Sequence, residues 1–289
     1  MSDALLPILE RIAKALERAF PVTDAPLLDD AAIAYRWHYP SEGLQRQARL
    51  LPIHNPQLIN VQDLCHLTRQ SALIMRNTRQ FVAGKPANHV LLTGTRGVGK
   101  SSLVKACLAE FHQQGLRLIE LDRDHLADLP MLLEKLKSSD KRFIIFCDDL
   151  SFDEGDSAYK GLKSALDGSL SSPSDNVLIY ATSNRRHLMQ QRIEDNLSVT
   201  RSESGELNPG ETVEEKVSLS ERFGLWLSFY PFTQEQYLDT VAHWLKVYGA
   251  PELTEQTRLD AINWATQRGS RSARVAMQFA RDQAIDSLQ

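Results

Sequence analysis

The sequence predicts an α/β fold, in which a parallel sheet is covered by helices on both faces and is followed by a small helical domain. Two observations predict it. Short apolar runs alternate with helical segments through the middle of the chain, and only helical patterns follow Pro231. Strands that are apolar along their whole length are typical of parallel sheets, because helices bury both faces. The expected strands are residues 90–92, 116–121, 143–147, 177–182 and 225–230.

The segment before the first strand predicts a helical lead-in. Residues 5–20 carry apolar side chains at helical spacing, interrupted by charged residues. Prolines then indicate an irregular passage as far as residue 52, and a second helical pattern covers residues 61–81. We therefore expect a lead-in over residues 1–52 and an α/β core over residues 53–232.

The residues after the core predict a helical domain over residues 233–289. Thr233 and Gln236 have the spacing of a capping box, which opens a helix that Gly249 can close. Further helical patterns cover residues 254–267 and the stretch from residue 270 to the end. Between the fourth and fifth strands, residues 194–215 are polar, acidic and broken by glycine and proline, which favours a surface loop.

Composition narrows the class of protein. The chain has 289 residues, 42% of them hydrophobic, which is enough for a substantial core. No apolar run approaches the roughly 20 residues of a membrane-spanning helix, so we expect no membrane partner. The three cysteines stand apart, without zinc-site or disulfide spacing, which indicates a reduced, cytoplasmic compartment.

The charge of the chain does not decide whether it binds nucleic acid. A net charge of −4 lacks the basic footprint of a dedicated nucleic-acid binder. The densest basic group either contacts phosphates or forms a solvated face; it consists of Arg185, Arg186, His187 and Arg192.

A phosphate-binding loop follows the first expected strand. Its residues, Gly94-Thr95-Arg96-Gly97-Val98-Gly99-Lys100-Ser101, match G-x-x-x-x-G-K-[ST] and precede an amphipathic helix. Glycines let the backbone N–H groups face inward, and the helix directs its positive end at the phosphates. Lys100 then neutralises the β and γ oxygens, and the Ser101 hydroxyl binds magnesium. The motif predicts ATP and Mg²⁺ as cofactors.

Acidic residues follow the third expected strand, where a P-loop protein needs them. Asp148 is expected to hold magnesium together with Ser101, and Asp149 to act as the general base that polarises the attacking water. Paired aspartates can also cap a following helix. The P-loop makes the metal-site interpretation the better one.

The fourth expected strand runs into Ser183 and Asn184. If this strand lies between the first and third, the Asn184 amide falls beside the same phosphates and can orient the attacking water. An asparagine at a strand end is otherwise a common turn residue.

These motifs together resemble the AAA+ ATPases, and most closely a bacterial AAA+ family of unknown function. The strings that carry the closer resemblance include Arg96-Gly97-Val98-Gly99-Lys100-Ser101-Ser102, Asp148-Asp149-Leu150-Ser151-Phe152, Ala181-Thr182-Ser183-Asn184-Arg185-Arg186 and Leu219-Ser220-Glu221-Arg222-Phe223-Gly224. The resemblance runs from about residue 35 to the C-terminus. It implies a sheet of five parallel strands in the order 5-1-4-3-2 and a helical lid.

The resemblance also implies roles for single residues. Ser102 joins the P-loop contacts, and Asn184 corresponds to sensor 1. Arg222 corresponds to an arginine finger that reaches the site of a neighbouring subunit, which implies a homo-oligomer. Arg271 corresponds to sensor 2, with Arg274 as the alternative, and Val61 lines the adenine pocket. Without the other motifs, surface salt bridges would explain the two arginines Arg222 and Arg271 better.

Two departures from the family pattern bear on activity. Asp149 stands where many AAA+ ATPases have glutamate, so the shorter side chain can leave hydrolysis slow. The segment after the second strand, residues 122–126, also lacks the aromatic-aliphatic pair with which similar translocases grip a polypeptide.

Two hypotheses about function follow. In the first, the protein is an oligomeric Mg²⁺-dependent ATPase that remodels an unidentified macromolecular client. In the second, it is a switch or loader, with ATP and ADP as its ligands, in which ATP binding controls affinity for a partner and turnover is slow.

Overall fold

The computed structural model describes residues 28–39, 48–152, 157–167, 175–184 and 219–286, together with Arg11, Ile12, Lys14 and the short strands β7 (Thr200–Arg201) and β8 (Leu207–Asn208). Most of the helix expected over residues 5–20, most of the loop expected over residues 194–215, and the basic group at Arg185 to Arg192 lie outside the described residues.

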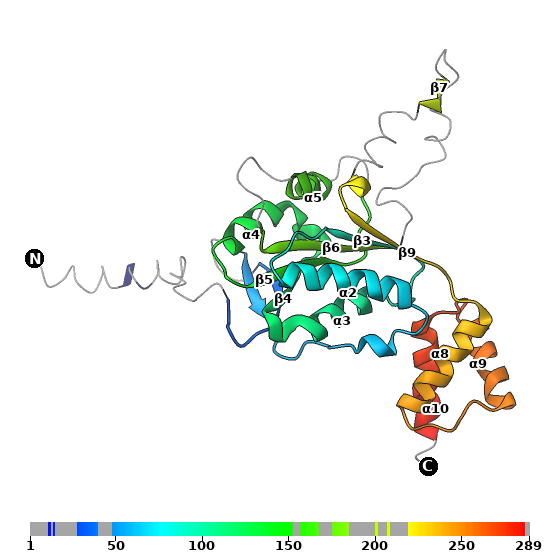
Figure 1. Cartoon of the computed structure of the whole chain (residues 1–289). Helices are drawn as coiled ribbons and strands as arrows, with labels where there is room; N and C mark the ends of the chain where they lie inside the picture. Colours follow the sequence, from blue (N-terminus) through cyan, green and yellow to red (C-terminus); the bar gives the residue numbers. More distant parts are fainter. Residues whose placement is uncertain are drawn as a thin grey trace, which may run out of the picture.

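A seven-stranded sheet forms the centre of the described structure, in the order β2-β1-β4-β5-β6-β3-β9 (Figure 1). Neighbouring strands are parallel except for β1 and β2, which are antiparallel. The strands are β1 (Ala34–His38), β2 (Arg49–Pro52), β3 (Val90–Gly94), β4 (Leu116–Glu120), β5 (Arg142–Cys147), β6 (Val177–Ser183) and β9 (Leu225–Phe229).

The expected α/β fold and the order of its five strands are confirmed, since β9-β3-β6-β5-β4 is the predicted order 5-1-4-3-2. The expected number of strands is wrong. β1 and β2 lie within the predicted helical lead-in and extend the sheet beyond β4. These strands are short and carry basic residues, and prolines lie at or just beyond their ends. What holds β1 in place is pairing with β4, more than 80 residues away in the chain.

Helices cover both faces of the sheet (Figure 1). One layer consists of α2 (Thr68–Val82) and α3 (Lys100–Phe111), and the other of the 3₁₀ segment η3 (Arg123–Asp128), α4 (Leu129–Leu136) and α5 (Ser157–Asp167). Successive residues of β5 alternate between the two layers: Phe143, Ile145 and Cys147 belong to the α5 side, Ile144 and Phe146 to the α2 side. This alternation explains why the strand is apolar throughout.

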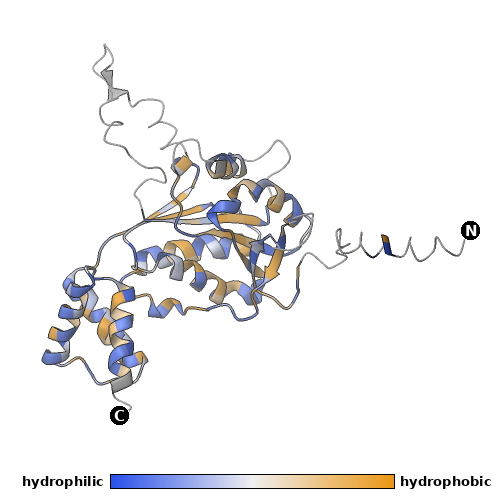
Figure 2. Cartoon of the chain, turned by 180° about the vertical axis from the view of Figure 1, so that it is seen from behind, coloured by the Kyte–Doolittle hydropathy of each residue, from blue (hydrophilic) through white to orange (hydrophobic). Residues whose placement is uncertain are grey.

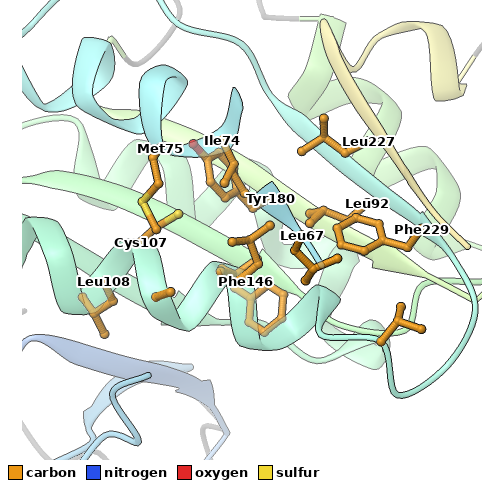
Figure 3. Close-up of a cluster of buried hydrophobic side chains, with 14 of the residues drawn as sticks. Leu67, Ile74, Met75, Leu92, Cys107, Leu108, Phe146, Tyr180, Leu227 and Phe229 are labelled. Carbon is orange, nitrogen blue, oxygen red and sulfur yellow. The ribbon is translucent and has the colours of Figure 1, made fainter. Parts of the chain in front are cut away.

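The core on the α2 side is continuous from helix to sheet (Figure 3). Leu92, Phe146 and Tyr180 project from the strands toward Ile74 of α2 and Cys107 of α3. Burial raises the pKa of the Cys107 thiol to about 12. Viewed from behind, apolar residues lie along the strands and on the helix faces turned toward them (Figure 2).

Three helices form a lid against one end of the core: α8 (Gln234–Val247), α9 (Glu255–Gln267) and α10 (Ala273–Asp286) (Figure 1). The expected capping box is confirmed, because Thr233 Oγ1 accepts from the Gln236 backbone N–H and Gln236 returns a hydrogen bond. Gly249 ends α8 with a φ of 68°. Among the described residues, no helix combines the length and the apolar character needed to cross a bilayer.

Candidate active site

The loop between β3 and α3 has the backbone of a phosphate cradle. Gly94, Gly97 and Gly99 have φ values of 126°, 75° and 107°, a region that favours glycine. A Cβ on Gly94 would lie 1.9 Å from the carbonyl oxygen of Phe229, so no other residue fits there. The Thr95 N–H donates to that same oxygen at 3.2 Å, which ties the loop to β9.

The lid and the residues just before α2 both contact this loop. The Gly97 carbonyl accepts from the Arg274 backbone N–H at 3.0 Å, and a Cβ on Gly97 would lie 2.9 Å from the Ser272 hydroxyl. On the other side, a Cβ on Gly99 would lie 3.0 Å from a methyl of Leu67. The loop therefore lies between the start of α10 and the residues that precede α2.

Lys100 lies at the centre of the site and is only 6% exposed. Its ammonium donates to the carbonyls of Gly94 at 2.7 Å and Thr95 at 2.8 Å, and to Asn184 Oδ1 at 2.9 Å. Burial lowers the pKa of Lys100 to about 8, although Asp148 and Asp149 partly oppose the shift. A buried cation held only by neutral oxygens is poised to accept an anion.

Ser101 and Asp148, the two residues expected to hold magnesium, lie in contact. Ser101 Oγ donates to Asp148 Oδ1 at 2.7 Å. Ser101 is the second residue of α3, and Asp148 directly follows β5, so the hydrogen bond connects the start of α3 to the carboxyl end of β5. Ser102 follows in the first turn of α3 and is partly buried.

Asp149 is held from two sides. Its Oδ2 accepts from Arg96 at 3.0 Å, and its Oδ1 accepts from the Asn184 amide. The residue has a φ of 52°, in the left-handed region that aspartate tolerates better than most residues. Asn184 therefore bridges Lys100 and Asp149, through its oxygen to one and its nitrogen to the other.

Thr182 is a site residue that sequence reasoning did not single out. Its hydroxyl donates to Asp148 Oδ1 at 2.5 Å and accepts from the Asp149 N–H at 2.9 Å. The available signal was its position near the end of the strand that leads to Asn184, two residues before that amide, because alternate residues of an extended chain point to one face.

Arg222 lies at the opposite edge of the sheet from the loop. It precedes β9, whose first residue pairs with Val90 at the start of β3, whereas the P-loop follows the end of β3. The length of β3 separates the two edges by roughly 13 Å. There Arg222 Nε pairs with Asp167 at the end of α5.

The two sensor-2 candidates differ in position. Arg274 donates its backbone N–H to the P-loop, and its charge is one of those that lower the pKa of Lys100, after burial. Arg271 lies before α10 and is exposed. The structure thus brings Arg274 beside the phosphate cradle.

The donors fit a nucleotide with Mg²⁺. A glycine cradle with no room for a Cβ at Gly94, a buried ammonium and a hydroxyl-carboxylate pair are what triphosphate oxygens and a hard cation require. Among the described residues, no cluster of three or more His, Cys, Asp or Glu side chains could hold a metal on its own.

A family model described as "Protein of unknown function (DUF815)" matches residues 30–286. The chain belongs to this family. Among curated proteins, none matches the sequence. The family assignment covers the sheet, the candidate site and the lid together.

Solved structures resemble this DUF815 protein. The Orc1 protein of Aeropyrum pernix, solved in complex with DNA, matches with a TM-score of 0.51 and 15% identity over 78% of this chain and 60% of that chain. A RuvB point variant of Thermotoga maritima matches with a TM-score of 0.47 and 16% identity over 78% and 62%. This chain spans less than two thirds of either. At such identity the Orc1 likeness establishes the fold alone, which is that of AAA+ P-loop proteins.

Proposed function

We propose that this DUF815 protein binds ATP with Mg²⁺ and hydrolyses it to remodel a partner macromolecule. One observation carries the proposal: Lys100, the Ser101–Asp148 pair and the Asp149–Asn184 pair converge on a single glycine cradle at the carboxyl edge of the sheet. Open α/β sheets bind their ligands at this edge.

Each residue has a role in the proposal. The backbone of residues 94–99 and the ammonium of Lys100 bind the phosphates, with Ser102 in the first helical turn beside them. Ser101 and Asp148 hold Mg²⁺, which when bound neutralises charge on the phosphoryl oxygens. Val61, in the segment before α2, is the residue that we propose for the adenine pocket.

Water activation falls to Asp149 and Asn184. The Asp149 carboxylate accepts a proton from the attacking water, and the Asn184 amide orients that water. Arg274 replaces Arg271 as the preferred contact to the γ-phosphate, since its backbone already bonds the loop.

Assembly completes the site. Arg222 lies an entire strand length from its own loop, so we propose that it serves the loop of a neighbouring subunit in a homo-oligomer. An arginine supplied in this way accelerates phosphoryl transfer by about 10³ to 10⁵.

A specific observation supports the alternative of a slow switch or loader. Both oxygens of Asp149 are already engaged, by Arg96 and Asn184, and the side chain is shorter than glutamate. A base in that state activates water only after these contacts rearrange. In this alternative, ATP and ADP select two states with different affinity for a partner.

Two carboxylate variants test the proposal. Asp149→Asn removes the proton acceptor and is expected to bind Mg·ATP normally while turnover falls about 10² to 10⁴-fold. Asp148→Asn is expected to weaken Mg²⁺-dependent binding as well. Calorimetry measures binding and phosphate release measures turnover. Equal turnover in wild type and Asp149→Asn would remove Asp149 as the base and favour the switch.

Mixing variants tests the arginine in trans. Arg222→Ala is expected to bind ATP and hydrolyse it very slowly, and Lys100→Ala to do neither. Together they should regain activity, because a Lys100→Ala subunit still offers Arg222 to an intact loop. Arg258→Ala, on the exposed surface of the lid, is the control. Absence of complementation, with specific activity independent of protein concentration, would contradict the trans arrangement.

A further inference from the structure

The end of β6 holds the segment after β5 through three consecutive residues. Thr182 contacts Asp148 and the Asp149 backbone, Ser183 Oγ donates to the Leu150 carbonyl at 2.7 Å, and the Asn184 amide donates to Asp149. The Thr182 carbonyl also accepts from the Leu150 N–H at 2.7 Å. Only the Thr182 hydroxyl reaches both the proposed metal carboxylate and the backbone of the proposed base.

The Thr182 hydroxyl is buried, and the direction of both of its hydrogen bonds is defined. Thr182 is 1% exposed, so water does not compete for its hydrogen bonds. Because it accepts from the Asp149 N–H, its own proton is directed to Asp148 Oδ1, the oxygen that also accepts from Ser101. One carboxylate oxygen is thus fixed by two hydroxyls, from α3 and from β6.

The hydrogen bond from the Asp149 N–H to the Thr182 hydroxyl supports the backbone conformation of Asp149. A left-handed φ of 52° is unfavourable for a residue with a Cβ unless the surroundings fix it. The bonds from the Asp149 and Leu150 N–H groups to Thr182 hold the backbone at that point. This conformation places the Asp149 side chain against Asn184 and Arg96.

We propose that Thr182 is a positioning residue of this site, whose hydroxyl sets the orientation of Asp148 for Mg²⁺ and the backbone of Asp149 for water activation. The inference rests on the proposed function. It assigns to β6 a role beyond leading to the Asn184 amide. Through the Thr182 hydroxyl, the strand fixes the Asp148 side chain and the Asp149 backbone.

Thr182→Val tests the inference, because it keeps the shape and removes the hydroxyl. The full chain is titrated with ATP in EDTA, and turnover is then followed against Mg²⁺ concentration. Losing a partner that orients a metal ligand typically lowers metal affinity or activity about 10 to 100-fold. The half-saturating Mg²⁺ concentration is therefore expected to rise about 10-fold and turnover to fall about 10 to 100-fold. ATP affinity without metal should stay within about twofold, and Thr182→Ser should restore the wild-type profile.

Ser183→Ala is the matched control, since it removes the neighbouring buried hydroxyl, which bonds the loop but neither aspartate side chain. It should lower the melting temperature without changing the Mg²⁺ dependence. If Thr182→Val does not fold, Thr182→Ala removes the same hydroxyl without the second methyl and carries the same expectation. In an Asp148→Asn background, either Thr182 change should add little to the shift in Mg²⁺ dependence, because both act through one carboxylate.

The outcomes separate the two proposals. A wild type without Mg²⁺-dependent ATP binding contradicts the proposed function. If the wild type shows Mg²⁺-dependent ATP binding and a folded Thr182→Val or Thr182→Ala variant has the same Mg²⁺ dependence, the role of Thr182 is overturned. A Ser183→Ala variant with the same Mg²⁺ shift as Thr182→Val also overturns it, because the effect would then be structural.

Discussion

The carboxyl edge of β3, β5 and β6 and the outer margin formed by β1 and β2 belong to one sheet but are built from different contacts. At the first, charged and amide groups bond one another around a glycine loop, with Lys100 and Asn184 at the centre. At the second, buried aromatic residues anchor a strand: Trp37 is 0% exposed, and Trp37 Nε1 and the Tyr39 hydroxyl both donate to Asp128 Oδ2, at 3.0 and 2.8 Å.

The difference separates function from stability. The edge holds the buried charge of Lys100, which is unfavourable for folding unless a ligand completes it. The margin concentrates apolar burial and satisfied polar groups, which favour folding. Substitutions in the first region should therefore change nucleotide binding more than stability, and substitutions in the second the reverse.

Trp37→Ala should have the largest effect on stability. Removing a fully buried tryptophan typically lowers the free energy of unfolding by about 3–5 kcal/mol, and here Asp128 also loses a donor. Urea unfolding measures it. Trp226→Ala, which changes a residue that is 37% exposed, should lower the free energy of unfolding by less. ATP affinity at low temperature should match wild type, and a parallel loss of affinity would contradict the separation.

Lys100→Ala should have the largest effect on binding. Losing the ammonium removes charge-assisted hydrogen bonds to phosphate, so ATP affinity should fall about 100-fold or more by calorimetry. Unfolding free energy should not fall, since a buried charge is also removed. Lys105→Ala, one turn further along α3, is the control and should bind ATP normally. Unchanged affinity in Lys100→Ala would contradict the P-loop assignment.

The lowered pKa of Lys100 predicts opposite pH trends for binding and stability. Its pKa is about 8 in the folded protein against an ordinary 10.5, so the ammonium loses its proton as pH rises through 8. ATP affinity should then fall by up to about tenfold per pH unit. The unfolded chain binds more protons between pH 8 and 10.5, so stability without nucleotide should rise across that window.

A lysine-to-arginine exchange sharpens this prediction. Lys100→Arg keeps its charge at every accessible pH, so its ATP affinity, although weaker, should not vary between pH 7 and 9.5. Calorimetry at several pH values, with urea unfolding alongside, measures both trends. A wild-type affinity that stays flat above pH 8 would contradict the role of the buried ammonium.

Glu120→Gln should have the smallest effect. Glu120 pairs with Arg36 at 2.8 Å across the β1–β4 boundary, but Arg36 is 55% exposed at its side chain. Exposed ion pairs contribute about 0–1 kcal/mol, so unfolding free energy should change by less than about 1 kcal/mol. A loss as large as that of Trp37→Ala would show that charge, and not apolar burial, anchors β1.

The sequence by itself determined the central strands, their order through the family resemblance, and the residues that meet at the carboxyl edge. Local rules explain this success: residues 94–101 need glycine at fixed positions, and Asp148 and Asn184 follow apolar strands directly, where parallel strands bring them to one edge.

Tertiary structure decided the rest. β1 exists because Trp37 and Tyr35 pack against elements about 90 residues away, a contact that no local pattern encodes. The choice of Arg274 over Arg271 as the arginine beside the loop depends on how α10 meets Gly97. No sequence pattern distinguishes Thr182 from the other residues of its strand. The pairing of β5 with β6 brings its hydroxyl between the two aspartates.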